Sequence, residues 1–509
     1  MTNLLETSAV ELRRMIGAKA ISPVELLEAC IARIEWLNPH VNAVTATCFE
    51  RAMIEAQAAE RAVMAGAPLG LLHGLPLGVK DLEPTKDLLT TWGSAIYRDH
   101  VPTEDIELVA RLRRAGAIVT GKTNVPEMGA GANSRNTVWG ATGNPFNPNL
   151  NAGGSSGGSA AALACDMLPL CTGSDTGGSL RIPAAKCGVV GFRPSPGVVP
   201  SVRKLLGWTP ISVVGPMGRT VADACLQLAA SAGMHAGDPL SYPLDPLSFL
   251  KPQDVDLSQL RVAYTEDFGV CAVDDGIRAS FRSKIAAMRH MFRSCDEIKL
   301  DLGEAHRCFD VLRAEAFVAG MHAAYERDPQ SLGPNSRANY EMGVKMSLLD
   351  SAWAQAEQTR LIKRFQSSFA DYDLVLSPTT PVSPFAWTQL YADTINGEKQ
   401  ENYYRWLGLT YVVTLLTHPA LSLPCGTDHL GLPFGLQIVG GFRADHQVLG
   451  AAHAMEQAFQ GHAGLRRPQP DLAALCSTRA EPPLRSIVTT PPVLDGHTAA
   501  AATLSTSAV

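Results

Sequence analysis

Apolar residues near the beginning of the chain recur at the spacing of amphipathic helices. Ser22 and Glu25 match the S-x-x-E capping box, and Pro23 occupies the first helical position, where a missing N–H costs nothing. Ser8 and Glu11 match the same box at an earlier start. After the second box, the apolar positions with helical spacing are Val24, Leu27, Ile31 and Ile34. The chain is therefore expected to begin with helices.

Short apolar runs and helical stretches alternate along the rest of the chain. A helix is expected to open at Thr103, with acids early and arginines late as the helix dipole favours, and to end at Gly116. A buried strand follows at 117–120, and the small residues of 159–167 predict another helix. The other expected strands are 75–81, 187–194, 260–266, 373–378, 420–424 and 435–440. This alternation favours an α/β layered fold.

Composition divides the chain into segments. After the N-terminal helices of 1–65, residues 66–230 hold the glycine-rich motifs and are expected to form the catalytic core. Residues 371–470 are expected to supply the C-terminal part of that core. Residues 235–370 are more helical and more charged, which suggests an insertion or a lid. Ser, Thr, Pro and Ala dominate the end of the chain, so 471–509 is expected to be a poorly ordered tail without chemistry.

The composition is typical of a large folded protein and excludes several classes of function. Of the 509 residues, 46% are hydrophobic and 18% are charged, and the net charge is −6. No Lys/Arg-rich block occurs, so we expect no nucleic-acid partner. No apolar run approaches the ~18 residues of a membrane span, so we expect no membrane contact. The 11 cysteines form no CxxC pair and no zinc-finger spacing, which predicts reduced thiols, no metal and a cytoplasmic location.

A nucleotide-binding motif occurs at 116–123. The segment GAIVTGKT fits the Walker A pattern G-x-x-x-x-G-K-[ST]. A P-loop needs a strand before its first glycine and a helix after its lysine. Here the strand lies inside the pattern, a helix precedes Gly116, and Pro126 follows closely. We interpret the segment as a helix end followed by a strand, with a nucleotide-binding protein kept as an alternative class.

A second short motif, GGSSG at 153–157, fits the nucleophile elbow of α/β-hydrolases, with Ser155 at its centre. That elbow requires a strand that runs into the serine. The preceding residues, NPFNPNLNA, are rich in Pro and Asn and are incompatible with a central strand. A serine–histidine esterase stays open as an alternative, with its base drawn from His418, His429 and His446.

A serine and a lysine can hydrolyse an amide without a histidine. The reaction needs a nucleophile, a base and donors for the oxyanion, and a neutral lysine can be the base. Lys80 follows the apolar run 75–79, and burial lowers the pKa of a lysine. The stretch SDTGGSL at 174–180 groups backbone N–H groups around Ser179, where glycines permit an anion-binding turn. The same stretch also fits a tight turn closed by Asp175.

A series of motifs resembles the amidase signature family. In chain order they are GVKD, GAIVTGKTNVPEM, GATGNPFNP, GGSSGGSAAALA, GSDTGGSLRIPAAKCGVVGFRPSPG, GPMGRTVAD, PTTPV, ALSLP and GLPFGLQIVG. Each motif is modest alone, but their order and spacing, over about residues 5–465, are specific. The resemblance implies a single amidase domain over 1–470. It also implies the amidase-signature fold, an α/β fold with a large, mixed, twisted β-sheet covered by helices on both faces.

The resemblance implies a Ser–Ser–Lys triad. Ser179 would be the nucleophile, Lys80 the base, and Ser155 the bridging residue, on a cis peptide bond after Gly154. The backbone N–H groups of the implied oxyanion hole belong to Thr176, Gly177, Gly178 and Ser179. The residues implied to support these loops are Gly154, Asp175 and Arg181. The implied chemistry needs no metal and no organic cofactor.

Two stretches depart from the family's common pattern. The family commonly has N-L-T-G-L-P-A where this chain has TLLTHPA, which brings Thr414 and His418 to positions expected near the substrate. GFRPSPG replaces the commoner G-L-K-P-T-x-G. The other residues expected to line the substrate pocket are Met128, Gly129 and Trp208. Because aromatic residues occur in the expected entrance, an apolar or aromatic amide, anilide or carbamate is the expected substrate.

The resemblance thus implies a serine amidohydrolase that cleaves a C–N bond through an acyl-enzyme, with an aryl acylamidase and a urethanase as its two expected forms. The family also includes glutaminase-type A subunits of transfer-RNA-dependent amidotransferases. Those subunits usually carry R-x-S-R-x-G after SPG, where this chain has VVPSVRKLLGW. We therefore expect a stand-alone hydrolase, a monomer or homodimer, that acts on a small molecule. The amidotransferase component remains the alternative.

Overall fold

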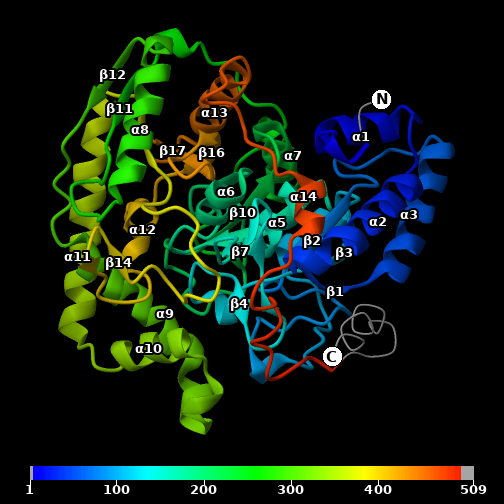
Figure 1. Ribbon diagram of the computed structural model, residues 1–509, viewed down its shortest axis with the longest axis horizontal. Helices are drawn as coiled ribbons and strands as arrows, with labels where there is room; N and C mark the ends of the chain where they lie inside the picture. Colours follow the sequence, from blue (N-terminus) through cyan, green and yellow to red (C-terminus); the bar gives the residue numbers. More distant parts are fainter. Residues whose placement is uncertain (1–3, 494–509) are drawn as a thin grey trace.

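One mixed β-sheet forms the centre of the molecule (Figure 1). The computed structural model describes residues 4–493, and within them the sheet has 11 strands. Their order is β1 (Val44–Thr47), β3 (Ile118–Thr123), β2 (Pro76–Lys80), β8 (Leu170–Asp175), β10 (Val213–Gly218), β9 (Val190–Arg193), β16 (Ala420–Thr427), β17 (Pro433–Gly440), β13 (Leu374–Pro378), β11 (Arg261–Tyr264) and β12 (Ser294–Glu297). β2 runs parallel to its neighbours β3 and β8, whereas β8, β10, β9, β16 and β17 pair antiparallel in succession. The predicted mixed sheet is confirmed.

Helices cover both faces of this sheet (Figure 1). They are α1 (Ala9–Gly17), α2 (Pro23–Val41), α3 (Phe49–Met64), α4 (Glu107–Arg114), α5 (Gly157–Ala164), α6 (Arg181–Cys187), α7 (Val221–Ser231), α8 (Asp275–Met288), α9 (Ala305–Arg327), α10 (Pro334–Gly343), α11 (Leu348–Ser367), α12 (Gly408–Leu415), α13 (Asp445–Gln460) and α14 (Leu472–Ser477). α5 and α6 pack against each other and against the middle strands, while α7 packs against α4, α13 and β10. The α/β layered fold follows from this arrangement.

Short strand pairs carry the loops beside the sheet. They are β4 (Arg135–Asn136) with β5 (Gly140–Ala141), β6 (Gly143–Asn144) with β7 (Asn147–Asn151), and β14 (Thr394–Ile395) with β15 (Glu398–Lys399). β7 therefore pairs outside the large sheet. The segment before Ser155 is not a central strand, as its Pro and Asn content predicts.

The capping residues fix the N-terminal helices as expected. Ser22 Oγ accepts the N–H of Glu25 at 3.0 Å, and the Glu25 carboxylate accepts the N–H of Ser22 at 2.8 Å. Both partners of the capping box are present, and the box sets the start of α2. Ser8 Oγ likewise accepts the N–H of Glu11 at the start of α1. The apolar faces of these helices join the main core.

The helix expected from Thr103 begins four residues later, as α4 at Glu107. The preceding residues are held by a neighbouring loop instead. The N–H of Ile106 donates to Pro84 O at 2.9 Å, and Asp105 Oδ1 accepts the N–H of Lys86 at 2.8 Å. Backbone and side-chain partners outside the helix therefore compete successfully with the first helical turn.

Residues 235–370 are helix-rich, as expected, but they are not an insertion set apart from the core. They contribute β11 and β12, which extend the large sheet beyond β13. β11 pairs in parallel with β13, with Val262 opposite Leu374. Both side chains are buried in the main core.

The expected poorly ordered tail is folded in its first part. Residues 471–493 include α14, which packs against α2, and Asp471 caps its first turn. Leu484 O accepts the N–H of Ala141 at 2.8 Å, and Leu484 packs beside Trp387. The rest of the expected tail, 494–509, lies outside the described residues.

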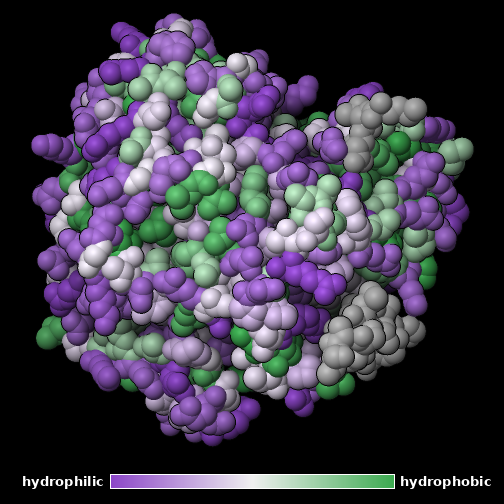
Figure 2. Space-filling view, viewed as in Figure 1, coloured by the Kyte–Doolittle hydropathy of each residue, from purple (hydrophilic) through white to green (hydrophobic). Residues whose placement is uncertain are grey.

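Polar residues cover most of the face in Figure 2, and apolar residues gather in small groups near its centre.

Eleven free cysteines are spread through the described chain, nine of them buried. Among residues 4–493, no helix combines the length and the apolar character that a membrane crossing requires.

Candidate active site

Lys80 is the last residue of β2, a buried inner strand of the large sheet. β2 lies between β3 and β8, and all five of its residues are buried. The Lys80 Nζ donates to Ser155 Oγ at 2.8 Å and to Ser174 Oγ at 2.9 Å, and lies 3.4 Å from Ser174 O. The Lys80 N–H is fixed by Thr172 Oγ1 at 2.9 Å. The structure thus brings the predicted lysine and one predicted serine into direct contact.

Burial lowers the pKa of Lys80 to about 7, although the charges of Glu83 and Asp175 oppose the shift. Two hydroxyls are its hydrogen-bond partners at the short distances, and no carboxylate of residues 4–493 forms an ion pair with it. A substantial neutral fraction therefore exists near pH 7. A neutral amine bonded to a hydroxyl can accept its proton.

Glycines allow the Ser155 loop to fit against its neighbours. The peptide bond between Gly154 and Ser155 is cis, as the resemblance implies. A Cβ on Gly154 would lie 3.0 Å from the backbone of Ala132. Gly158, in the first turn of α5, approaches Asn124 so closely that a Cβ would lie 2.2 Å from its nitrogen. Ser155 is 3% exposed, so its hydroxyl is directed by packing rather than by solvent.

The Asp175 carboxylate organises the loop that carries Ser179. It accepts the N–H of Gly178 at 2.9 Å and the N–H of Leu180 at 3.2 Å. Arg181 donates to it through Nε and Nη2, at 3.1 and 2.9 Å, and Arg193 Nη1 lies 3.3 Å away. Burial alone would raise the pKa of Asp175, but the two arginines outweigh it and hold the pKa well below its usual range. Asp175 therefore stays ionised and fixes the loop.

The hydrogen bonds of Asp175 exclude one of the four expected oxyanion donors, the N–H of Gly178. The Gly178 N–H already donates to Asp175, so it is not available to an oxyanion. For the N–H groups of Thr176, Gly177 and Ser179, no acceptor occurs in the described part of the chain. Three of the four expected donors are thus available for an anionic ligand.

Side chains from distant positions donate to two backbone carbonyls of the Ser179 loop. Arg193 Nη1 donates to Asp175 O at 2.8 Å, on the peptide whose N–H belongs to Thr176. Thr410 Oγ1 donates to Gly177 O at 2.7 Å, on the peptide whose N–H belongs to Gly178 and donates to Asp175, so this contact positions the turn. A charged donor on a peptide carbonyl polarises the group and strengthens its N–H as a donor. Sequence reasoning missed Arg193 and Thr410 in these roles.

Ser179 differs from Lys80 and Ser155 in being partly exposed. Ser179 is half-buried, and its Oγ has no hydrogen-bond partner among residues 4–493. Gly129, one of the expected pocket residues, lies beside Ser155, since a Cβ placed on it would be 3.5 Å from Ser155 Oγ. Met128 and Gly129 are both half-buried, and Met128 has a positive φ of 50°.

Two of the expected pocket residues, Thr414 and His418, form hydrogen bonds inside the protein. Thr414 is fully buried and accepts a hydrogen bond from Arg181 Nη2 at 2.8 Å. It therefore belongs to the hydrogen-bond network of Arg181 and Asp175 that holds the Ser179 loop. His418 is also fully buried, with Nδ1 2.6 Å from Leu416 O and Nε2 2.9 Å from Gln366 Oε1. The expectation that these two residues contact substrate is therefore wrong. Trp208 is 76% exposed, so its side chain is not part of an enclosed wall.

The Walker-type segment has no phosphate cradle. Lys122 lies in β3, is buried, and its Nζ donates to Glu83 O at 2.5 Å and Thr85 Oγ1 at 3.0 Å. A P-loop lysine must be free to reach phosphate. Of the histidines considered as bases, His418 is engaged as described, and His446 stacks on Phe249. Lys80, not a histidine, is the basic group bonded to Ser155.

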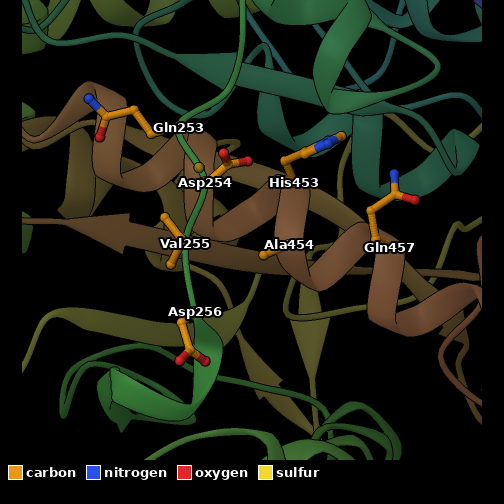
Figure 3. A pocket seen from close by; sticks show the side chains of 8 residues that line it. Gln253, Asp254, Val255, Asp256, His453, Ala454 and Gln457 are labelled. Atoms are coloured by element: carbon orange, nitrogen blue, oxygen red, sulfur yellow. The ribbon is translucent and has the colours of Figure 1, made fainter.

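A surface cavity of about 540 Å³ occurs beside α13 (Figure 3). It is formed by residues 253–256 and by α13, and Asp254, His453 and Gln457 project around it. None of the expected site residues lines this cavity.

Within residues 4–493, no group of three or more His, Cys, Asp or Glu side chains has a geometry suited to a metal ion.

Comparisons with known proteins identify the family of the chain. A family model described as "Amidase" matches residues 25–449. The chain is 33% identical over 465 residues to an acylamidase of Rhodococcus erythropolis, covering 89% of this chain and 96% of that one. It is 32% identical over 477 residues to the A subunit of the glutamyl-tRNA(Gln) amidotransferase of Acaryochloris marina, covering 89% and 98%.

A solved bacterial aryl acylamidase described as belonging to the amidase signature enzymes superposes with a TM-score of 0.84 and 28% identity. The match covers 93% of this chain and 99% of that one. The chain belongs to the amidase signature family. This membership assigns it to the amidases, hydrolases that act on C–N bonds.

Proposed function

We propose that this protein is a stand-alone serine amidohydrolase that uses Ser179 as nucleophile, Ser155 as proton relay and Lys80 as base. The observation that carries the proposal is the 2.8 Å hydrogen bond between Lys80 Nζ and Ser155 Oγ at a buried lysine. The lowered pKa of Lys80 supports its role as base. The substrate is a small amide, anilide or carbamate, and no metal or cofactor takes part.

In the first half-reaction, neutral Lys80 takes the proton of Ser155 while Ser155 takes that of Ser179. The Ser179 oxygen attacks the substrate carbonyl, and the resulting oxyanion is held by the N–H groups of Thr176, Gly177 and Ser179. The proton returns through Ser155 to the leaving nitrogen, and the C–N bond breaks. Water then hydrolyses the acyl-enzyme through the same relay and releases the acid.

The glutaminase-type component of an amidotransferase is a second candidate, because similarity to such a protein extends over 89% of the chain. Glutamine hydrolysis that requires co-purifying partner proteins would identify it. Hydrolysis of simple amides or anilides by the purified chain alone supports the stand-alone enzyme. Monomer or homodimer, and cytoplasmic location, stay predictions of the sequence.

The test is a release assay with purified protein on a panel of primary amides, anilides, esters, carbamates and glutamine. Ser179→Ala is expected to lower kcat by several orders of magnitude on every substrate the wild type cleaves. Ser156→Ala is the matched control, because the Ser156 hydroxyl is buried next to Ser155 and has no hydrogen-bond partner among residues 4–493. Near-normal turnover by Ser179→Ala would reject the assignment.

A further inference from the structure

Arg313 is a buried arginine close to the loop of Ser179. It lies on α9 and is 6% exposed. One turn earlier on α9, Phe309 packs against that loop, since a Cβ added to Gly177 would lie 3.7 Å from Phe309 Cζ. Helix residues four apart share a face, with Cβ atoms about 5–6 Å apart. Arg313 therefore lies about one helical turn beyond the contact with the loop.

A second path of contacts links Arg313 to the other loop of the site. Arg313 Nε donates to Asn339 Oδ1 at 3.2 Å, on α10. One turn earlier on α10, Asn335 Nδ2 donates at 2.8 Å to the carbonyl oxygen of the residue after Gly129. Gly129 in turn lies beside Ser155. Two independent paths thus connect Arg313 with the loops of both proposed catalytic serines.

The hydrogen-bond partners of the Arg313 guanidinium in the described part of the chain are neutral. The Arg313 Nη2 donates to the hydroxyl of Tyr403 at 2.7 Å. Within residues 4–493, no carboxylate forms an ion pair with Arg313, and its Nη1 has no hydrogen-bond partner. The nearest acids in sequence are engaged elsewhere. Asp310 accepts from the Tyr404 hydroxyl at 2.7 Å and from Arg405 Nη2 at 2.8 Å, and Glu315 accepts from a serine of α11.

Aromatic rings surround the guanidinium. Its Cζ lies 4.8 Å from the ring centroid of Phe317, 5.1 Å from that of Tyr404, 5.7 Å from that of Tyr403 and 6.0 Å from that of Phe309. Such contacts stabilise a cation only in part, and burying an unpaired charge remains costly. An arginine kept in this setting is well suited to a carboxylate ligand, which a guanidinium binds with two parallel hydrogen bonds.

We propose that Arg313 is a substrate-binding residue, and that the preferred substrates are amides with a carboxylate at the end remote from the scissile bond. The inference rests on the proposed hydrolysis at Ser179. The aromatic side chains near Arg313 would contact the apolar chain between the amide and the carboxylate. The mono-amides of short aliphatic dicarboxylic acids have this design, with a neutral amide, an apolar middle and an anionic end.

The experiment compares charged and neutral amides of equal length. The charged series is succinamate, glutaramate and adipamate, and the neutral series is butanamide, pentanamide and hexanamide. A lost hydrogen bond to a charged group corresponds to a factor of roughly 10 to 150. We expect at least one charged amide to exceed its neutral partner in kcat/KM by such a factor. Equal kcat/KM values across all pairs would overturn the proposal.

The variant Arg313→Gln is expected to reduce that selectivity ratio by roughly 10- to 150-fold, mainly through KM for the charged amide. Arg307→Gln is the matched control, because Arg307 is an exposed arginine of the same helix that stacks on Trp353. It is expected to leave the ratio unchanged. A fall of the same size for charged and neutral amides in Arg313→Gln indicates a structural role and contradicts the proposal.

A binding measurement separates the substrate site from the chemistry. Calorimetric titration of Ser179→Ala with adipamate and with hexanamide is compared with the same titrations of Ser179→Ala/Arg313→Gln. Tighter binding of adipamate that is lost in the double variant supports the carboxylate site, even if Ser179→Ala unexpectedly retains turnover and the proposed nucleophile fails. Equal binding of the two ligands by Ser179→Ala refutes the carboxylate site whatever the outcome for the nucleophile.

Discussion

The pH dependence of catalysis should report the ionisation of Lys80. Its ordinary pKa of 10.5 would leave roughly one lysine in 3,000 neutral at pH 7, whereas a pKa of about 7 leaves about half neutral. Burial in β2 thus raises the population of competent base roughly a thousandfold. As the pH rises through about 7, Lys80 loses its proton, so kcat/KM should rise and then level. Below the midpoint it should fall about tenfold per pH unit.

Replacing Glu83 by Gln should move that midpoint. The charge of Glu83 raises the pKa of Lys80, opposing burial. Burial also raises the pKa of Glu83 itself to about 7, so the two groups titrate in the same range. Unit charges on the order of 10 Å apart interact by about 1.7 kcal/mol at an effective dielectric of about 20, or about one pKa unit. Glu83→Gln should therefore shift the midpoint toward acid by up to about one unit.

The assay is kcat/KM from pH 5 to 9 on one uncharged amide, for the wild type, Glu83→Gln and Glu104→Gln. Glu104 is an exposed surface residue, so its replacement controls for a general change in charge. Lys80→Arg should be inactive throughout, because a guanidinium stays protonated over this range. An unchanged midpoint in Glu83→Gln, or activity that declines from pH 6 to 8, would refute the assignment of Lys80 as base.

The remaining predictions concern the nucleophile loop and the Walker-type segment. Gly178→Ala should lower the free energy of unfolding by about 1–3 kcal/mol, because Gly178 has a φ of +115° and an added Cβ would lie 2.2 Å from Thr410 Oγ1. Gly177→Ala should cost less, because the nearest non-neighbouring atom to its added Cβ is 3.7 Å away. Thermal unfolding of the two variants measures the difference. Asp175→Asn should cost about 3–5 kcal/mol in urea unfolding, since it leaves two buried arginines without their carboxylate, and a loss below about 1 kcal/mol would contradict that account. ATP with Mg²⁺ should leave Tm unchanged, because Lys122 is buried and bonded; a rise in Tm would restore the nucleotide-binding interpretation of 116–123.

The sequence predicts those parts of the site whose geometry follows from local motifs. GVKD places Lys80 at the end of a buried strand, and a strand of this kind is recognisable from its apolar run. The glycines before Ser155 signal a backbone that approaches its neighbours closely. Contact between Lys80 and Ser155, 75 positions apart, still depends on the order of strands in the sheet.

Hydrogen-bond competition among groups far apart in sequence could not be predicted. Nothing in TGGS indicates that Asp175 takes the N–H of Gly178 and leaves that of Gly177, since this depends on backbone angles in the turn. Thr410, which fixes Gly177 O, lies 233 positions away. His418 differs from the common pattern and suggested altered substrate contacts, yet it packs against the rings of Phe365 and Phe369. A departure from a family pattern marks a changed environment without telling which side of a helix or loop changed.

The hydrogen bond between Arg181, beside the Ser179 loop, and a residue of β17 has a consequence for splitting the chain into two fragments. Arg181 Nη1 donates to Gln437 Oε1 at 2.6 Å, although 256 positions separate the two residues. The loop is therefore completed by β17, in the C-terminal part of the chain. A fragment that ends at residue 230 would contain Lys80, Ser155 and Ser179 but would lack this partner. If the chain is cut in the 235–245 connection, activity should return only when the two halves associate, so the pair can serve as a split reporter whose signal measures their association.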